Sequence, residues 1–337
     1  MSKNTHDGPP VIFLMGPTAS GKTDLALQLC EHLPCDIVSV DSSQVYREMN
    51  IGTAKPEPEV LEVAPHRLIN IREPSEVYSV GEFVQDARRE IAEISAEGRI
   101  PLLVGGTMAY FKALRDGIAD LPPSNEQIRR EIEGEAAEKG WPFVHGLLAL
   151  VDPSSAALIH PNHSQRIARA LEVYRVSGQT LSALKQKQLQ SGSKVPALEK
   201  NYRLTQLALI PNDRKLLHKR IEQRFYAMLN GGFIEELEHL RQRGDLNTDL
   251  PSVRAVGYRQ IWDYLDSKTT YEEMYEKGLA ATRQLAKRQL TWLRAWPDLH
   301  RLAIDFDSGG DGLFGEDVLR RSMAVLKESS IYNGVSE

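Results

Sequence analysis

Cysteine is nearly absent from this sequence, which holds only Cys30 and Cys35 among its 337 residues. Two cysteines cannot build a disulfide framework or a cysteine-rich zinc site, so both kinds of small scaffold are excluded. Long apolar runs are missing as well. The longest early one, 11–15, is far shorter than the roughly 20 residues of a membrane-spanning helix, and the N-terminal MSKNTHDGPP is too polar for a signal peptide. We therefore expect a cytoplasmic protein that associates with no membrane.

A strong net charge is also lacking, because 41 basic and 46 acidic residues give a formal charge of −5 at pH 7. This average counts against a nucleic-acid partner, since nucleic-acid-binding domains usually carry a basic balance. The local distribution is different. Residues 201–224 hold six bases and two acids, residues 277–301 hold six bases and one acid, and the segment after Arg301 holds three bases and seven acids. The acidic average therefore conceals two basic segments.

Alternating strands and helices dominate the first 115 residues and return after residue 203. Short apolar runs predict four strands, at 11–15, 36–40, 100–104 and 204–211. Segments with helical spacing predict five helices around them, at 23–32, 81–98, 213–229, 233–244 and 271–296. Fully apolar strands in repeated strand–loop–helix order predict an α/β fold, with a parallel sheet covered by helices on both faces.

The pattern changes after Leu121, where helical spacing continues to about residue 200 without a convincing strand. The polar stretch 186–200 is typical of a linker or an exposed loop. We expect four parts of the chain. They are an α/β core in 1–121, an all-helical insertion domain in 122–200, a continuation of the core with basic C-terminal helices in 201–300, and an acidic terminal segment with a short terminal element in 301–337.

A phosphate-binding loop follows the first predicted strand. GPTASGKT (16–23) matches the pattern G-x-x-x-x-G-K-[ST], with a strand before it and a helix after it. Glycines let successive backbone amides converge on phosphate oxygens, and the helix N-terminus adds the positive end of its dipole. Lys22 supplies a point charge, and Thr23 offers the kind of oxygen that Mg²⁺ prefers. We predict a P-loop NTPase-like sheet and eight phosphate-binding residues: Gly16, Pro17, Thr18, Ala19, Ser20, Gly21, Lys22 and Thr23.

Polar side chains also follow the second and third predicted strands. Asp41 and Thr107 should reach one crevice, because ligands of parallel α/β sheets bind beyond the carboxyl ends of the strands. Three roles compete for Asp41: Mg²⁺ ligand, helix N-cap and general base. Thr107 offers a hydroxyl, or belongs to a plain strand-to-helix turn. The motifs themselves leave two alternatives, a small-molecule or nucleotide kinase and a transferase acting on a diphosphate.

The basic segment 277–301 has a helical pattern. At about 100° per residue, Arg283, Lys287 and Arg294 fall within about 40° of one another and form one stripe. The adjoining face is apolar and is expected to pack inward: Ala286, Leu290 and Leu293. A run of charge is most often a solvated helix face. Several such runs beside a phosphate loop make binding to a nucleic-acid backbone an equally good explanation.

Nine motifs match one known family, in that family's order, from residue 10 to about 296. They are GPTASGKT (16–23), DSSQVYR (41–47), IGTAKP (51–56), PHRLI (65–69), PLLVGGTMAYFKAL (101–114), HPN with QRIARALEVY (160–174), IEQRF (221–225), SVRAVGYRQ (252–260) and TRQLAKRQLTWLR (282–294). The chain resembles the bacterial tRNA dimethylallyltransferases, also called tRNA isopentenyltransferases or the IPP transferase family. One departure is His163, which stands where the family's HPND-like element has Asp. The Cys/His zinc finger of some eukaryotic members is absent.

The resemblance implies a reaction. A five-carbon prenyl group moves from dimethylallyl diphosphate to the exocyclic amine (N6) of the adenosine 3′-adjacent to the anticodon, in tRNAs reading codons that begin with U, and diphosphate is released. The phosphate loop, with Lys22 and a Mg²⁺ cofactor, then holds the diphosphate of the donor rather than ATP. Arg224 resembles the family's diphosphate-contacting arginine. Asp41 is expected to accept the proton of the amine, and Thr107 to position the amine or a diphosphate oxygen.

The resemblance also implies a tRNA-binding surface. Its expected residues are Asp41, Ser42, Ser43 and Gln44; Thr107 and Arg129 at the entrance; Gln165, Arg166, Ile167, Ala168 and Arg169; Arg254, Ala255, Val256, Gly257, Tyr258 and Arg259; and Lys287, Arg288, Gln289, Leu290, Thr291, Trp292, Leu293 and Arg294. We expect a monomer whose partners are the tRNA anticodon stem-loop and dimethylallyl diphosphate. An ATP-using kinase would leave the basic helix unexplained. A P-loop RNA-binding module without catalysis would leave the crevice residues without a purpose.

Overall fold

Two compact units make up the chain in the computed structural model, which describes residues 8–118, 121–191, 195–306, 316–329 and 331. One unit is formed by Met1–Ala113 with Glu199–Glu337, and the other by Leu114–Leu198. The second unit begins inside helix α4 (Met108–Asp116), earlier than the start at residue 122 expected from the sequence. Each unit has its own apolar core.

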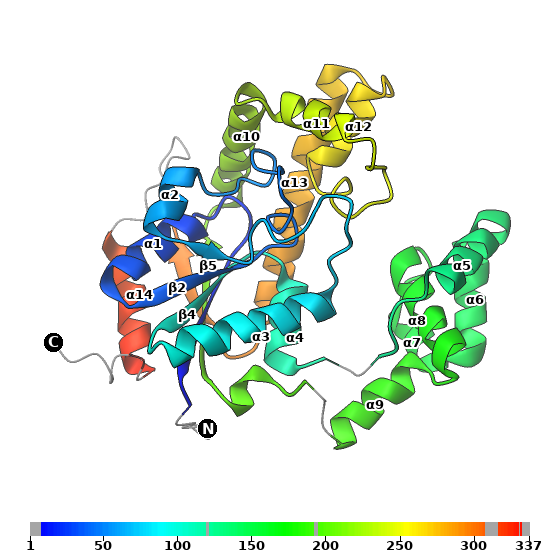
Figure 1. Cartoon of the computed structure of the whole chain (residues 1–337), viewed down its shortest axis with the longest axis horizontal. Coiled ribbons are helices and arrows are strands. Elements are labelled where there is room, and N and C mark those ends of the chain that lie inside the picture. Colours follow the sequence, from blue (N-terminus) through cyan, green and yellow to red (C-terminus); the bar gives the residue numbers. More distant parts are fainter. Residues whose placement is uncertain (1–7, 119–120, 192–194, 307–315, 330, 332–337) are drawn as a thin grey trace. The chain divides into compact units, whose positions relative to one another are not determined.

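A six-stranded sheet forms the centre of the first unit, and each pair of neighbouring strands is parallel. Its order is β3-β2-β4-β1-β5-β6, and β2, β4 and β5 are labelled in Figure 1. The strands are β1 (Pro10–Met15), β2 (Cys35–Val40), β3 (His66–Arg67), β4 (Ile100–Gly105), β5 (Arg203–Pro211) and β6 (His300–Ile304). Residues 11–15 of β1 are 0% exposed, as expected for a central parallel strand covered on both faces. The predicted α/β fold with a parallel sheet is confirmed.

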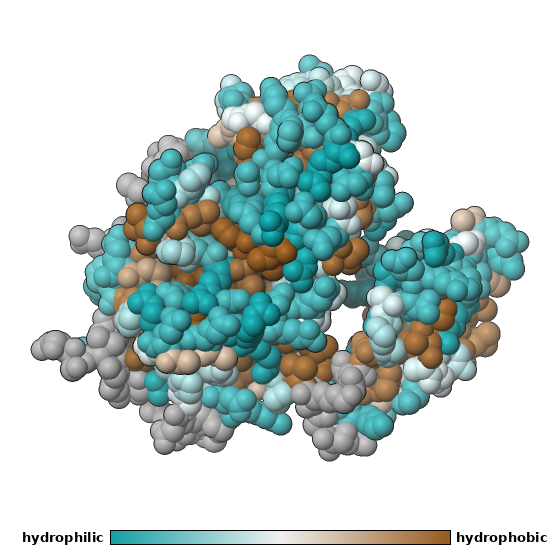
Figure 2. Space-filling model, viewed as in Figure 1, coloured by the Kyte–Doolittle hydropathy of each residue, from teal (hydrophilic) through white to brown (hydrophobic). Residues whose placement is uncertain are grey.

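The connections from β1 to β2 and from β3 to β4 cross the sheet in opposite directions, so the usual right-handed crossover puts the helices that follow β1 and β3 on opposite faces. Helix α1 (Lys22–His32) packs against α14 (Glu316–Glu328), and the short helix α2 (Pro58–Val63) precedes β3. Helix α3 (Val80–Ala96) begins with a capping box between Ser79 and Glu82. The apolar positions of α3 face the sheet and are buried, while the visible surface over this helix is mostly hydrophilic (Figure 2).

Four further helices follow β5: α10 (Arg214–Asn230), α11 (Phe233–Gln242), α12 (Tyr258–Leu265) and α13 (Tyr271–Arg294). Helix α13 packs against both α10 and α12. The inward face predicted for it is confirmed, because Ala286, Leu290 and Leu293 are at most 8% exposed. The sequence did not indicate α12, which has only eight residues.

The terminal segment contributes to the core more than its acidic composition indicated. Strand β6 extends the sheet next to β5, and α14 buries Val318, Ser322 and Leu326. The strand sequence HRLAI escaped prediction because two basic residues begin it and acidic residues follow it. The glycine-rich stretch 307–315 lies outside the described residues.

The second unit is built from α5 (Glu126–Lys139), α6 (Trp141–Val151), α7 (Pro153–Leu158), α8 (Ser164–Ser177) and α9 (Leu181–Ser191). Its core includes Ile132, Val144, Leu148 and Ile167, all 0% exposed. Helix α9 continues to Ser191, where the polar sequence from 186 onward indicated a linker. Within the described ranges of both units, no helix is long and apolar enough to cross a membrane.

Candidate active site at the carboxyl edge of the sheet

The phosphate loop joins β1 to α1. Ala19 and Gly21 have φ angles of 61° and 79°, in the left-handed region, so the backbone turns sharply just before the helix. Gly16 allows close packing, because a Cβ there would fall 2.6 Å from the Ser20 hydroxyl. Gly21 caps α1 without a side-chain hydrogen bond, which leaves the first amides of the helix for a ligand. The geometry is that of an anion-binding site.

Gln289 on α13 ties this loop to the end of β4. Its Oε1 accepts a hydrogen bond from the Thr18 amide at 2.8 Å, and its Nε2 donates to the Gly106 carbonyl at 2.9 Å. The side chain is buried beneath the loop. The sequence placed Gln289 among the tRNA-contacting residues. In the structure, the oxygen and the nitrogen of its side-chain amide both form hydrogen bonds with the backbone around the anion site.

Positive charge gathers at the loop. Lys22 donates from Nζ to the Pro17 carbonyl at 2.8 Å. Burial and the nearby Arg224 lower the pKa of Lys22 to about 7, while Asp41 acts in the opposite direction. Burial also lowers the pKa of Arg224, and Arg220 adds to that effect. Lys22 and Arg224 are thus buried cations that repel each other. A bound polyanion would neutralise their charge and remove that repulsion.

Arg220 lies one helical turn before Arg224 on α10 and was not singled out from the sequence. Its Nε donates to the Ala19 carbonyl at 3.0 Å, and its guanidinium carbon lies 4.8 Å from the centre of the Phe306 ring. The spacing of four residues from Arg224 was the signal that could have found it. The two arginines, on neighbouring turns of one helix, face the same loop.

Asp41 follows β2 and lines the cavity described below. Its Oδ1 accepts hydrogen bonds from the amides of Ser43 at 2.8 Å and Gln44 at 3.3 Å. Residues 42–45 form turns and not a helix, so the helix N-cap alternative for Asp41 is wrong and it caps a turn instead. Among the described residues, Oδ2 accepts no hydrogen bond. One carboxylate oxygen thus holds the loop, and the other is available for chemistry.

Thr107 follows β4 and contacts the loop after Asp41. Its Oγ1 accepts from the Ser42 amide at 3.1 Å and lies 3.4 Å from the Ser42 hydroxyl, while its own amide donates to the Val40 carbonyl at 3.2 Å. The β4 residues that line the cavity are Val104 and Gly105, followed by Gly106. Thr107 is half-buried and, through Ser42, braces the segment that carries Asp41.

A cavity of about 890 Å³ opens beside these groups. Its polar side is formed by the phosphate loop, the residues after β2 and the two arginines of α10. Apolar lining residues come from α10, α11, α13 and the turn before α12: Ile221, Phe225, Met228, Phe233, Val256 and Leu285. One cavity therefore combines an anion site, a free carboxylate oxygen and an apolar wall.

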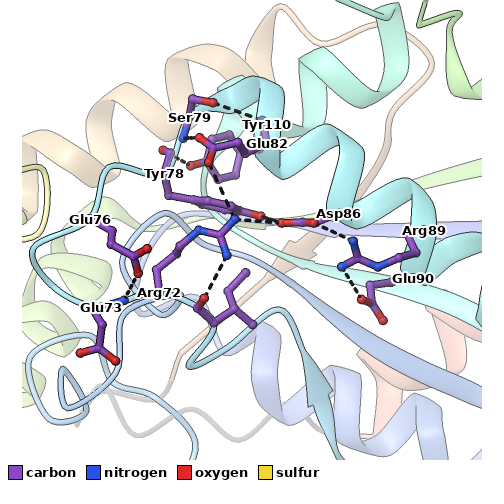
Figure 3. A network of polar contacts seen from close by, with 11 residues as sticks. Arg72, Glu73, Glu76, Tyr78, Ser79, Glu82, Asp86, Arg89, Glu90 and Tyr110 are labelled. Carbon is purple, nitrogen blue, oxygen red and sulfur yellow. Dashed lines mark hydrogen bonds and ion pairs between the residues drawn. The ribbon is translucent and has the colours of Figure 1, made fainter. Parts of the chain in front are cut away.

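Tyr78 also lines this cavity, although no motif pointed to it. Its hydroxyl donates to Asp86 at 2.9 Å, and the guanidinium carbon of Arg72 lies 4.8 Å from its ring centre. Arg72 pairs with Asp86 at 3.5 Å, so the three side chains contact one another (Figure 3). Burial and Asp86 raise the pKa of Tyr78. This network fixes the segment before α3 and holds the ring at the cavity wall.

The core segments predicted to contact tRNA differ in exposure. On α13 the exposed members are Lys287, Arg288, Thr291, Trp292 and Arg294, while Leu290 and Leu293 are buried. Residues 41–44 and 254–258 line the cavity. Arg254 is exposed, and Arg259 pairs with Asp263 at 3.3 Å. Among the predicted tRNA-contacting residues of the first unit, the candidates are therefore the exposed residues and those that line the cavity.

In the second unit, Gln165 and Arg166 are exposed, whereas Ile167 and Ala168 belong to the core. Arg169 and Arg129 both pair with Glu172, at 2.9 and 3.2 Å, and the Glu172 side chain is 0% exposed. The Asn125 amide donates to the other oxygen of that carboxylate at 2.7 Å. These interactions lower the pKa of Glu172 despite its burial. One buried carboxylate thus orients both arginines.

Few protein groups at the site can hold a metal ion. Thr23 is exposed and lines the cavity together with Asp41. The Ser20 hydroxyl is buried without a hydrogen-bond partner in the described part of the chain. No cluster of three His, Cys, Asp or Glu side chains suited to a metal occurs among the described residues. This donor set fits Mg²⁺, which often uses one or two protein oxygens and takes the rest from phosphate and water.

The fold and this site define a P-loop protein with an apolar cavity beside its anion site. The family model for IPP transferase matches residues 44–296, and the chain belongs to that family. The predicted resemblance and the prediction of a transferase are thereby confirmed.

Solved structures agree with this assignment. The full-length tRNA isopentenylpyrophosphate transferase from Bacillus halodurans is 34% identical, with a TM-score of 0.65 over 97% of this chain and 99% of that chain. The tRNA delta(2)-isopentenylpyrophosphate transferase from Staphylococcus epidermidis is 31% identical, with a TM-score of 0.66 over 95% of this chain and 99% of that one. A eukaryotic dimethylallyltransferase acting on tRNA shares the fold, at 24% identity and a TM-score of 0.76 over 96% of this chain and 80% of that chain.

Proposed function

We propose that this protein transfers a dimethylallyl group from dimethylallyl diphosphate to N6 of the adenosine 3′-adjacent to the anticodon, in tRNAs reading U-initial codons. The observation that carries the proposal is the single cavity that pairs a phosphate loop with a carboxylate and an apolar wall. The apolar side chains beside the anion site suit the hydrocarbon part of an allylic diphosphate. Membership of the IPP transferase family, whose two bacterial structures above are named as tRNA-modifying enzymes, supports tRNA as the acceptor.

The donor's diphosphate is bound by the amides of the phosphate loop and by Lys22 and Arg224. Burial of these cations strengthens their attraction for a polyanion, because the local dielectric is low. Thr23, with oxygens of the diphosphate itself, would hold Mg²⁺, which when bound supplies further charge for the leaving group. Gln289 and Arg220 keep the loop in the binding conformation through its backbone.

The transfer forms one bond and breaks another. The C1–O bond of the allylic donor breaks, and its electron pair leaves with the diphosphate, whose charge Lys22 and Arg224 stabilise. The N6 nitrogen bonds to C1, and the excess proton passes to a carboxylate. Asp41 is the candidate base, because its Oδ1 is held by two amides while Oδ2 accepts no hydrogen bond from the described residues. Thr107 positions this loop through Ser42.

The acceptor adenosine has to leave the anticodon stack to enter the cavity, which costs stacking energy. Contacts with the neighbouring nucleotides offset that cost. Three exposed basic side chains of α13 are suited to bind phosphate oxygens: Lys287, Arg288 and Arg294. Arg254 lines the cavity. In the second unit, Arg129, Gln165, Arg166 and Arg169 are proposed for the same role.

The test is an incubation of the protein with unmodified tRNA, Mg²⁺ and either dimethylallyl diphosphate or ATP. We expect prenylated adenosine at the predicted position and release of diphosphate with the first donor only, read by mass spectrometry of nuclease digests. A phosphorylated product from ATP, or no product from the prenyl donor, would reject the proposal. A tRNA with guanosine at that position serves as the negative acceptor control.

A further inference from the structure

Helix α10 carries the charged and the apolar lining of the cavity side by side. Arg220 and Arg224 face the phosphate loop, and Ile221, Phe225 and Met228 contribute to the apolar wall. At about 100° per residue, all five side chains fall within an arc of about 140° on one helix. A donor whose diphosphate lies at the arginines therefore directs its hydrocarbon tail toward Phe225 and its neighbours.

The phenylalanine rings of this wall are packed directly against glycine backbone. A Cβ on Gly278 of α13 would fall less than 3.0 Å from the Phe225 ring. A Cβ on Gly257 or Gly52 would fall equally close to the Phe233 ring. Three glycines from separate parts of the chain therefore create the space that the two rings occupy.

This packing leaves the rings no room to retreat from the cavity. Phe233 is 0% exposed and lies edge-on to the Tyr258 ring at 4.8 Å, and Phe225 is 4% exposed with Tyr275 at 5.8 Å. Moving either ring outward would drive it into main-chain atoms, which are far less compliant than a flexible side chain. The apolar lining of the cavity is therefore rigid at these two rings.

We propose that Phe225 and Phe233, seated on Gly278, Gly257 and Gly52, restrict the donor to a five-carbon prenyl group. This inference rests on the function proposed above and adds the element that determines donor length. The reaction is unchanged for a longer donor: the same C1–O bond breaks, the same N6–C1 bond forms and diphosphate leaves. A ten-carbon donor fails because its second isoprene unit would overlap the rings.

The size of the expected discrimination follows from general experience with rigid pockets. One surplus methylene in a tight apolar pocket changes kcat/KM by about 10–200-fold. Five surplus carbons against two immobile rings should therefore lower kcat/KM for geranyl diphosphate by at least about 100-fold relative to dimethylallyl diphosphate. The cavity also has to accommodate the acceptor nucleoside, so its total volume does not relieve this restriction.

The experiment compares the two donors on one tRNA with the full-length wild-type protein and the variants Phe225→Leu and Phe233→Leu. Both variants keep an apolar side chain and shorten it, so we expect the fold to be retained at a lower melting temperature. Tyr226→Leu is the matched control, because Tyr226 is the next residue on α10, is 58% exposed and does not line the cavity. Product masses separate adenosine carrying one isoprene unit from adenosine carrying two, and thermal melting checks folding.

We expect the ratio of kcat/KM for the ten-carbon donor to that for the five-carbon donor to rise at least about tenfold in Phe225→Leu or Phe233→Leu. The ratio should stay at the wild-type value in Tyr226→Leu. Equal use of both donors by the wild type overturns the inference, as does an unchanged ratio in both folded variants. Failure of the wild type to transfer either group would instead reject the proposed function.

Discussion

The two carboxylate oxygens of Asp41 have different surroundings and different expected roles. Oδ1 caps the turn that follows β2, and Oδ2, which accepts no hydrogen bond from the described residues, is the atom proposed to take the proton of the acceptor amine. Asp41→Asn keeps an oxygen that can accept the two amide hydrogen bonds but removes the base. We expect this variant to lower kcat by about 10²–10⁴-fold, with the Kd for tRNA nearly unchanged, in single-turnover assays combined with filter binding.

Asp41→Ala is the companion variant, because it removes the turn cap as well as the base. It should lose the same activity and in addition show a lower melting temperature than Asp41→Asn. If Asp41→Asn transfers prenyl groups at the wild-type rate, Asp41 is not the base and its role is limited to the turn.

The proposed role of Lys22 in holding the diphosphate predicts that donor binding depends on pH. Its pKa of about 7 in the free protein means that the ammonium loses its proton as the pH rises through neutrality, whereas bound diphosphate requires the charged form. Above pH 7 binding must therefore take up about one proton, and this contribution weakens affinity by up to about tenfold per pH unit. Isothermal titration calorimetry with inorganic diphosphate, in buffers of different ionisation enthalpy, measures the uptake.

The matched control is Lys22→Arg, whose guanidinium stays protonated throughout this range. Ionisation of diphosphate itself contributes equally to both proteins, so the difference between them isolates Lys22. Identical proton uptake by the wild type and Lys22→Arg would show that the lysine is already charged in the free protein.

Among the secondary-structure elements, α13 combines two roles on opposite faces. Its buried face holds Gln289, Leu290 and Leu293, and its exposed face carries Lys287. We expect Lys287→Ala to weaken tRNA binding and to reduce the slope of log K against log salt by about one. Filter binding over a range of salt concentrations measures both quantities.

Two other positions on α13 sharpen this test. Lys277→Ala removes an exposed lysine outside the predicted contact segment and should leave the slope unchanged. Arg283 pairs with Glu222 at 3.1 Å, so Arg283→Ala should have a smaller effect than Lys287→Ala. An unaltered slope in Lys287→Ala would identify the basic stripe as an ordinary solvated helix face.

The inner face of α13 gives a different prediction. Gln289→Ala leaves the Thr18 amide and the Gly106 carbonyl without their partner, which should cost about 1–3 kcal/mol of unfolding free energy. The phosphate loop loses its brace, so we expect KM for dimethylallyl diphosphate to rise about tenfold while the Kd for tRNA is maintained. Steady-state kinetics and chemical denaturation test both parts. Weaker tRNA binding with an unchanged KM would instead place Gln289 at the tRNA surface.

Across the whole molecule, the sequence predicted structure best where a local pattern of residues is compatible with only one secondary-structure element. The apolar run before GPTASGKT predicted β1 and the loop, and the period of α13 predicted its buried face. Strand β6 was missed because charged residues surround it. Tyr78, the loop-bracing role of Gln289 and the apolar side chains around Phe233 were not predicted, because their contacts join segments far apart in the chain, which no local pattern records.

The division into two units predicts separable stability. Glu172→Ala removes the carboxylate shared by Arg129, Arg169 and the Asn125 amide, and should lower the stability of the second unit by about 1–3 kcal/mol. The core unit should still bind diphosphate with its wild-type affinity. Hydrogen exchange resolves the two units, and calorimetry measures the binding. Uniform destabilisation of both units would contradict the prediction.

Glu133→Ala, on the exposed face of α5, is the control and should change neither property. The contribution of Glu172 also has a defined pH dependence. Its pKa in the folded protein is lowered from the ordinary 4.5, so the carboxylate stabilises the unit at neutral pH. That stabilisation is lost only as the pH falls through the lowered value.

The position of β1 between β4 and β5 has a consequence for biosynthesis. The strand that precedes the phosphate loop is made first, but its partner β5 follows the entire second unit in the sequence. At the usual elongation rates of about 5–20 residues per second, the ribosome needs on the order of 10–40 s to travel from β1 to the end of β5. The second unit can fold during this interval, because its contacts are local. Throughout this interval β1 lacks its partner β5, and an unpaired strand edge favours aggregation until β5 has been made.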